Sequence, residues 1–226
     1  MSEKPNPRVS VVMITMNEQG SVGKVIQDIQ KAYPVSEILL VDSSKDQTPQ
    51  IAESLGAKVV RQFPPQGYGP AMDRALRSAS GDIVITLDCD DTYPAEDIPR
   101  FVRYIAEEGY DVVDGSRLEH KSPHMPALNY LANYAFGIFA STLFFRRITD
   151  LHSGMRAYRR SVIEELKYDC KGAALPVELL LRPLKDGRKV KFIFIDYRMR
   201  IGESTMRPLE SAWWTLKRIL GVRLTA

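Results

Sequence analysis

The chain has 226 residues, 44% of them hydrophobic and 26% charged, proportions typical of a globular protein with one sizeable core. Its formal net charge of +3 is too small to indicate a nucleic-acid partner, so we expect none. Two cysteines are too few for a disulfide framework, and the polar N-terminus lacks a signal-peptide pattern, which favours a cytoplasmic location. These numbers predict one domain over residues 1–226.

The first half of the chain alternates between short apolar runs and amphipathic segments. The apolar runs predict strands at residues 9–14, 37–41, 58–61, 82–87 and 111–116. Between them, the spacing of apolar residues predicts helices at residues 22–33, 48–55, 70–80 and 96–108. Strands that alternate with helices predict an α/β fold, with a mostly parallel sheet flanked by helices on both faces.

The second half departs from this alternation. It predicts an uncharged helix at 128–145, a polar loop at 150–156, two shorter helices and a strand at 189–197. A final amphipathic helix begins at Pro208, and we expect the segment 208–226 to lie at a membrane surface, because basic residues outnumber acidic ones in this part of the chain.

The uncharged helix has two interpretations. Its length lies at the lower edge of a membrane-spanning segment, but Asn129, Asn133, Ser141 and Thr142 interrupt it. One interpretation is a helix that lies partly in the core and partly faces a membrane or a lipid; the other is a plainly buried helix.

A group of carboxylates follows the strand at 82–87. Asp88, Asp90 and Asp91 lie within four residues of one another, directly after the apolar residues Ile83–Leu87. Carboxylate oxygens are the ligands that Mg²⁺ and Mn²⁺ prefer, so Asp88 and Asp90 are candidate ligands of a cation that bridges two phosphates. The alternative interpretation is a solvated acidic turn.

Other polar residues follow other strands. Thr15–Glu18 come after the first strand and Asp42 after the second. In sheets of this kind ligands bind beyond the carboxyl ends of the strands, so we expect these residues to lie near Asp88 and Asp90 on one edge.

Several segments in this order resemble the family 2 glycosyltransferases of the GT-A fold, a Rossmann-like architecture, and among them the dolichyl- and polyprenyl-phosphate hexose synthases. The resemblance covers roughly residues 8–220. The matching segments are Val12–Glu18, Val41–Asp46, Gly67–Gly69, Leu87–Pro94, Gly115–Arg117, Ser153–Arg156 and Arg200–Ser204.

The resemblance implies an inverting transferase. It would move a hexose from a nucleotide-sugar, GDP-mannose or UDP-glucose, to a polyprenyl or dolichyl phosphate, with Mg²⁺ or Mn²⁺ held by Asp88 and Asp90. It would work as a peripheral protein at the cytoplasmic face of a membrane. Arg117, Asp150 and Arg200 would be the other catalytic residues. The implied substrate-binding residues are Thr15, Asn17, Glu18, Asp42, Gly67, Gly69, Asp91, Ser153, Arg156 and Ser204.

Within this resemblance, individual roles differ. Thr15, Asn17 and Glu18 would border the nucleoside, and Asp42 would bond the base. Arg117 and Arg200 would lie near the donor and acceptor phosphates. Asp150 and the segment Ser153–Arg156 would line the reaction centre.

The chemistry of the acceptor decides which residues matter most. An alcohol acceptor needs a general base, for which Asp150 is the candidate, although it is equally a turn or N-cap residue. A lipid phosphate is already anionic and needs arginine instead. His152 is more often structural than catalytic, and Glu178, in an apolar helix, either holds an arginine or lines the acceptor site.

Other classes of function remain as alternatives. A dinucleotide-dependent oxidoreductase would need G-x-G-x-x-G after the first strand, and Asn17–Gly23 does not supply it. A family 2 glycosyltransferase that acts on an alcohol acceptor, either soluble or on a growing glycan, is the nearest alternative to transfer onto a lipid phosphate. A non-catalytic protein that binds nucleotide-sugars is the third, and would be favoured if Asp88 and Asp90 bound no metal.

Overall fold

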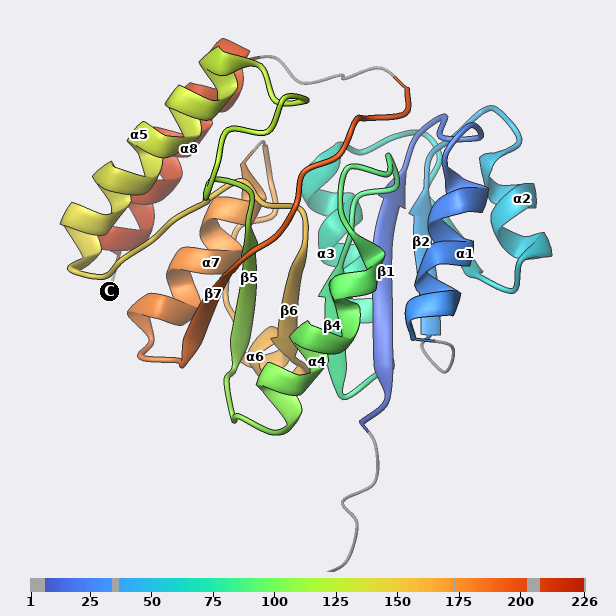
Figure 1. Ribbon diagram of the computed structural model, residues 1–226, viewed down its shortest axis with the longest axis horizontal. Coiled ribbons are helices and arrows are strands. Elements are labelled where there is room, and N and C mark those ends of the chain that lie inside the picture. The colour runs from blue at the N-terminus through green and yellow to red at the C-terminus, as the bar shows by residue number, and fades with distance from the viewer. Residues whose placement is uncertain (1–6, 34–36, 173, 203–207, 226) are drawn as a thin grey trace, which may run out of the picture.

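The protein is described by a computed structural model for residues 7–33, 37–172, 174–202 and 208–225. In this part of the chain, seven strands form one sheet in the order β3-β2-β1-β4-β6-β5-β7, and every strand except β6 runs parallel to the others (Figure 1). The strands are β1 (Val9–Thr15), β2 (Glu37–Asp42), β3 (Lys58–Arg61), β4 (Ile83–Thr86), β5 (Val112–Ser116), β6 (Arg156–Arg159) and β7 (Val190–Phe194).

Both faces of the sheet are covered, which explains why its central strands are apolar without alternation. In β1, Val11 packs in the core formed with the residues of α1, α2 and α4, whereas Val12 packs in the core formed with those of α3, α6 and α7. The helices are α1 (Val22–Ala32), α2 (Thr48–Ser54), α3 (Tyr68–Ser78), α4 (Ile98–Ala106), α5 (Ala127–Phe144), α6 (Arg160–Glu165), α7 (Leu175–Lys185) and α8 (Pro208–Leu224), and the 3-10 helix η1 is Ala95–Asp97.

A third layer lies beyond α7. Helices α5 and α8 lie side by side there and share an apolar cluster with α7, to which Ala140, Leu180 and Ile219 belong (Figure 1). The turn at Leu151 also joins this cluster, so the layer touches the loop that leads into β6.

The predicted α/β fold is confirmed, and one strand was missed. Residues 150–156 were expected to be loop, but Arg156–Arg159 form β6, antiparallel to both β4 and β5. Four residues with an arginine at each end show neither an apolar run nor a clear alternation, so the pattern did not reveal a strand. The predicted helix at 96–108 divides into η1 and α4.

The outer helices expose more apolar surface than expected. In α5 only Gly137 and Ala140 are buried, and Leu128 is 73% exposed, so the interpretation as a plainly buried helix is wrong. Helix α8 buries Ile219 and Val222 in the cluster shared with α5 and α7, but it also buries Arg218 and exposes Trp213. Among the described residues, no helix combines the length and apolar character needed to cross a membrane.

Candidate active site

The ends of β1 and β2 are joined by a buried carboxylate. Asp42 is fully buried and accepts hydrogen bonds from the hydroxyls of Thr15 (2.7 Å) and Ser44 (2.6 Å), while its other oxygen accepts from the Arg61 guanidinium. These contacts hold the two strand ends together. Since both oxygens of Asp42 are already bonded, contact with a base stays a prediction that would require one of these bonds to open.

The turn after β1 is held in place by backbone contacts. Asn17 has a positive φ of 62°, and its side-chain oxygen accepts a hydrogen bond from the backbone of Lys45 at 2.9 Å. Glu18 accepts from the Ser21 hydroxyl at 3.2 Å, and burial raises its pKa. Asn17 and Glu18 stay partly accessible, as the predicted nucleoside contacts require.

Asp88 and Asp90 have different surroundings. Asp90 is buried; one of its oxygens accepts two hydrogen bonds from Thr92, and the other lies 2.8 Å from the guanidinium of Arg200. The Asp88 carboxylate has no hydrogen-bond donor among the described residues. Burial, together with the neighbouring Asp90 charge, raises the pKa of Asp88 to about 7.

This pair fits a divalent cation that completes its coordination elsewhere. The Asp88 carboxylate has no donor among the described residues, and burial together with repulsion from Asp90 makes its negative form unfavourable, which a cation would reverse. No third histidine, cysteine or carboxylate completes a metal-binding group within the described ranges. The remaining ligands would therefore be phosphate oxygens and water, as is common for Mg²⁺.

Gly154 lies directly against the Asp88 carboxylate. A Cβ atom built on Gly154 would lie 2.4 Å from Asp88 Oδ2, closer than any real contact. The backbone N–H of Gly154 donates to the Tyr93 hydroxyl at 2.6 Å, which fixes the loop in this position. Only glycine can occupy this place while Asp88 keeps its position.

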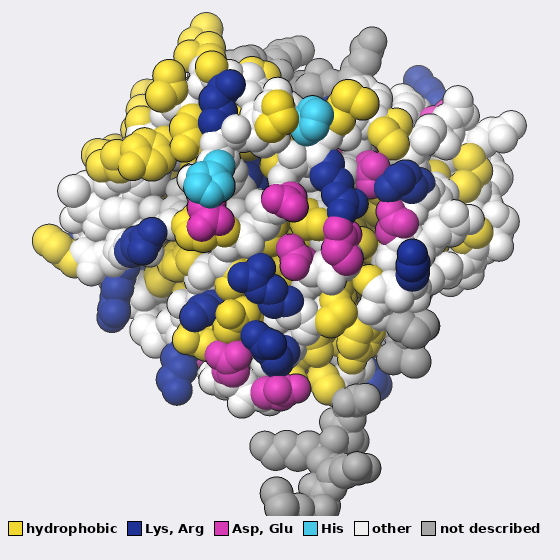
Figure 2. Space-filling model, viewed as in Figure 1, with side chains coloured by type: hydrophobic (Ala, Val, Ile, Leu, Met, Phe, Trp, Pro, Cys, Tyr) yellow, Lys and Arg dark blue, Asp and Glu magenta, His cyan; other side chains and the backbone are white. Residues whose placement is uncertain are grey.

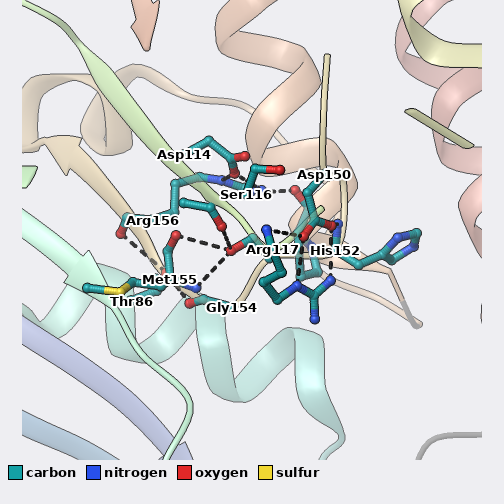
Figure 3. A network of polar contacts seen from close by, with 12 residues as sticks. Thr86, Asp114, Ser116, Arg117, Asp150, His152, Gly154, Met155 and Arg156 are labelled. Carbon is teal, nitrogen blue, oxygen red and sulfur yellow. Dashed lines mark hydrogen bonds and ion pairs between the residues drawn. The ribbon is translucent and has the colours of Figure 1, made fainter. Parts of the chain in front are cut away.

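A bidentate ion pair joins Arg117 and Asp150. Arg117 Nε and Nη2 donate to the two oxygens of Asp150 at 2.7 and 2.9 Å, a bidentate arrangement visible in Figure 3. The guanidinium also lies 5.9 Å from the ring centre of Tyr93 and 5.5 Å from that of Tyr197. Its remaining nitrogen, Nη1, has no partner within the described part of the chain.

Asp150 is held in its charged form. Burial alone would raise the pKa of this carboxyl, but the Arg117 guanidinium outweighs burial and lowers it. The side chain is fully buried, and the backbone of His152 donates a further hydrogen bond at 3.0 Å. An ionised carboxylate whose oxygens are occupied in this way is a poor general base, although it holds an arginine well.

Arg156 and Ser153 are buried and bonded to protein groups, so direct substrate contact by either stays a prediction that would require these bonds to open. Arg156 is 1% exposed and bonds Asp114 and the carbonyl of Pro176, beneath the site (Figure 3). The Ser153 hydroxyl donates to the Gly115 carbonyl at 2.5 Å and is buried as well. Both residues support the loop that carries Gly154.

The remaining predicted substrate-binding residues have different surroundings. Gly69 is packed against the carbonyl of Cys170, where a Cβ atom would clash at 1.8 Å, so close packing accounts for the glycine, and its contact with substrate stays a prediction. Gly67 is exposed with φ of 96°, and Asp91 forms an ion pair with Lys24 at 2.8 Å. Ser204 lies outside the described residues.

Sequence reasoning missed two contributors: Thr92, which holds Asp90, and Tyr93, which anchors Gly154. It placed Gly154 in a segment expected to line the reaction centre but did not reveal its contact with Asp88. Thr92, Tyr93 and Gly154 lie inside segments that carried the resemblance, but the contact between Tyr93 and Gly154 joins residues 61 positions apart. The glycine itself was the one available signal, since glycine often marks a close approach of the backbone.

The comparisons with known proteins agree with this geometry. The family model described as "Glycosyl transferase family 2" matches residues 10–167. The chain belongs to glycosyl transferase family 2. It is 40% identical to a dolichyl-phosphate hexose transferase of Haloferax volcanii over 92% of this chain and 90% of the relative. It is also 30% identical to the low-salt glycan biosynthesis hexosyltransferase Agl6 of that organism, over 92% of this chain and 52% of the relative.

Solved structures show the same fold. Glucosyl-3-phosphoglycerate synthase from Mycobacterium tuberculosis, crystallised with Mn²⁺, UDP-glucose and phosphoglyceric acid, matches with a TM-score of 0.76 at 21% identity. The match covers 96% of this chain and 80% of that one. The predicted GT-A architecture and the assignment to the glycosyltransferases are thereby confirmed.

Replacing Gly154 by alanine is expected to lower transferase activity by at least about tenfold, because the new methyl group displaces the Asp88 carboxylate. Gly221→Ala is the matched control, since a Cβ atom there meets nothing within 4 Å. Activity and thermal unfolding would be measured for both. Full activity of Gly154→Ala would show that Asp88 is not needed in this position.

Proposed function

We propose that this family 2 enzyme transfers a hexose from a nucleotide-sugar to a polyprenyl phosphate, such as dolichyl phosphate, with inversion at the anomeric carbon. The observation that carries the proposal is the Arg117–Asp150 pair. It supplies a guanidinium whose Nη1 has no partner among the described residues, and it occupies the carboxylate that an alcohol acceptor would need as a base. The similarity to a dolichyl-phosphate hexose transferase supports the same choice.

In this proposal the donor lies across the ends of β1, β2 and β4, with its diphosphate at Asp88 and Asp90. Mg²⁺ or Mn²⁺ held by that pair would neutralise the charge that develops on the β-phosphate as the nucleoside diphosphate leaves. Arg200, 2.8 Å from Asp90, is placed to contact the same diphosphate.

The acceptor phosphate is bound through Arg117 Nη1. One of its oxygens attacks the anomeric carbon from the face opposite the diphosphate, so the new C–O bond forms as the bond to the β-phosphate oxygen breaks. No proton has to be removed from the nucleophile, because a phosphate monoester is mostly dianionic at neutral pH. A single displacement inverts the anomeric configuration.

The surface beside the site suits a lipid. An open groove of about 750 Å³ begins at Leu118, the residue after Arg117, and runs along α5 between Tyr134, Ile138 and Phe145. We propose that this side of the molecule rests on the membrane that holds the acceptor, at its cytoplasmic face. Figure 2 shows hydrophobic side chains gathered over this region, at the upper left.

The function is tested with radiolabelled GDP-mannose, UDP-glucose and related donors, each incubated with polyprenyl phosphate and a divalent cation. Label is expected in the butanol-extractable fraction for one donor, and Asp88→Asn should remove it. Label that appears only in water-soluble product would favour the alcohol-acceptor alternative. Donor binding without any transfer would favour a non-catalytic nucleotide-sugar-binding protein.

Vesicle binding tests the membrane proposal separately. The exposed apolar residues Leu209 and Trp213 lie on α8, and basic residues follow α5 at Arg146 and Arg147. We expect binding to anionic vesicles that weakens as salt increases, because screening reduces the attraction between basic residues and lipid headgroups. Replacing Leu209 and Trp213 together by glutamate should abolish sedimentation with vesicles.

The control for that experiment is Phe63→Glu, which changes an exposed aromatic residue just after β3, on the far side of the sheet from α8. Phe63→Glu is expected to bind vesicles as the unchanged protein does. Equal binding of all three proteins would contradict a membrane surface formed by α8.

Metal affinity is expected to depend on pH through Asp88. Its pKa is raised to about 7, so below neutrality a cation has to displace a proton, and affinity should fall by about tenfold per pH unit. Above pH 7 affinity should level off. For the metal-free protein the same raised pKa means that stability decreases as pH rises from about 4 to 7. Mn²⁺ titrations between pH 5.5 and 8 test this, and pH-independent affinity would contradict it.

A further inference from the structure

The imidazole of His152 connects the turn at Asp150 to helix α8. His152 Nε2 lies 2.7 Å from the Thr215 hydroxyl, and the ring lies edge-on to Phe136 of α5 with centroids 5.8 Å apart. Figure 3 shows the ring pointing away from the Arg117–Asp150 pair, so it is not directed at the reacting atoms. The histidine therefore links the site to the outer layer of helices.

The direction of this hydrogen bond follows from the partners of Thr215. The Thr215 hydroxyl donates its own proton to the carbonyl of Ser211 at 2.7 Å, so it accepts from the N–H at His152 Nε2. The other ring nitrogen, Nδ1, is buried and has no partner within the described ranges. Thr215 is consequently the single polar anchor of the ring among the described residues. Burial lowers the pKa of His152 to about 4, which leaves the ring neutral at pH 7.

The same turn orients Asp150. The backbone N–H of His152 donates to Asp150 Oδ1 at 3.0 Å, and Asp150 holds Arg117 through two hydrogen bonds. Leu151, which lies between Asp150 and His152 in the chain, is fully buried in the cluster to which Ile219 and Val222 of α8 belong. Helix α8 thus fixes the turn at two consecutive residues.

We infer that His152 is a positioning residue, which through its bond to Thr215 lets the docking of α8 set the orientation of Asp150 and hence of Arg117. This inference rests on the proposed function, in which Arg117 binds the acceptor phosphate. The transfer step itself needs no proton from His152. Loss of the ring anchor should therefore weaken use of the acceptor and leave the donor side unchanged.

Thr215→Val tests the inference without touching the site, because valine keeps the shape and removes the acceptor oxygen. The matched control is Thr225→Val, which loses the same kind of bond to the carbonyl four residues earlier, Gly221, but contacts no histidine. We expect KM for polyprenyl phosphate to rise about fivefold in Thr215→Val, the effect of one lost neutral hydrogen bond. KM for the nucleotide-sugar should stay unchanged, and Thr225→Val should leave both KM values as they are.

Two further comparisons separate positioning from general destabilisation. In an Arg117→Ala background, Thr215→Val should add no further loss, because its effect passes through Arg117. His152→Gln, whose amide can still donate to Thr215, should keep more of the acceptor affinity than His152→Leu; this pair gives the answer if Thr215→Val does not fold.

A KM for polyprenyl phosphate that is unchanged in Thr215→Val, while Arg117→Ala raises it, would overturn the inference and leave the proposed function intact. If Thr215→Val raised KM by the same factor in the unchanged enzyme and in Arg117→Ala, that result would also overturn the inference. Absence of transfer to polyprenyl phosphate by the unchanged enzyme would instead overturn the proposed function.

Discussion

Asp88→Asn and Asp90→Asn are each expected to reduce sugar transfer by at least about a thousandfold, with the fold retained. Asparagine keeps the volume of each side chain but removes the charge that a divalent cation requires. For Asp88 no hydrogen bond among the described residues depends on the carboxylate, so stability should not fall. Transfer assays with excess Mg²⁺ or Mn²⁺, with thermal unfolding in parallel, measure both effects.

Asp90→Asn differs in one respect that makes it informative. Asp90 also bonds Thr92 and Arg200, so its replacement should lower the unfolding temperature somewhat, unlike the change at Asp88. The unchanged enzyme should lose activity in EDTA and regain it when metal is added. Activity in EDTA equal to that in Mg²⁺ or Mn²⁺ would refute a role for these aspartates in metal binding.

Arg117→Ala is expected to cost at least ~2 kcal/mol of transition-state stabilisation with polyprenyl phosphate as acceptor, and so is Arg200→Ala. Asp150 makes two hydrogen bonds to Arg117, and its loss leaves a nearly buried guanidinium without its partner. We therefore expect Asp150→Asn to cost about as much as Arg117→Ala.

The double variant distinguishes the two roles of Asp150. If Asp150 acts by holding Arg117, then Arg117→Ala with Asp150→Asn should be no slower than Arg117→Ala alone. If Asp150 is a general base, the losses of activity caused by the two single changes should multiply in the double variant. A fully inactive Asp150→Asn beside an active Arg117→Ala would mean an alcohol acceptor, and the lipid-phosphate proposal would be wrong.

The fold was predictable because its signals are local. Apolar runs and helical spacing mark most strands and helices, and an ordered set of short segments identified the family. Strand β6 was not predicted, because contacts with residues that are distant in the sequence stabilise it. Arg156 is stable in the interior because it bonds Asp114, which is 42 positions away, and no local pattern reveals that pairing.

The site was predicted in outline, while the contacts of its members were not. The sequence placed acidic residues and arginines near one edge, since strand ends meet there. It could not show that Arg117 is paired with Asp150, that Gly154 touches Asp88, or that Arg156 and Gly69 are buried against other parts of the chain. For α5, a helix without charges looks the same in sequence whether it is buried or exposed, and only the structure showed that most of it is exposed.

The single antiparallel strand has a topological consequence for how such enzymes diversify. The chain leaves β5 at Ser116, on the edge that carries the site, and because β6 runs in the opposite direction it re-enters the sheet on that same edge at Arg156. Residues 117–155 therefore form an excursion whose two ends are both anchored at the reaction centre, without a return across the sheet.

Such an excursion behaves as an exchangeable cassette. It contains Arg117, Asp150 and the whole of α5, whereas Thr15, Asp42, Asp88 and Asp90 all lie outside it. Its length and helices can change while the register of every strand pair stays the same. In the proposed function, the acceptor-binding Arg117 lies in this segment and the metal-binding pair lies outside it. A graft of residues 117–155 between family members would therefore have to keep Gly154 against Asp88 and Leu151 in its cluster with α8.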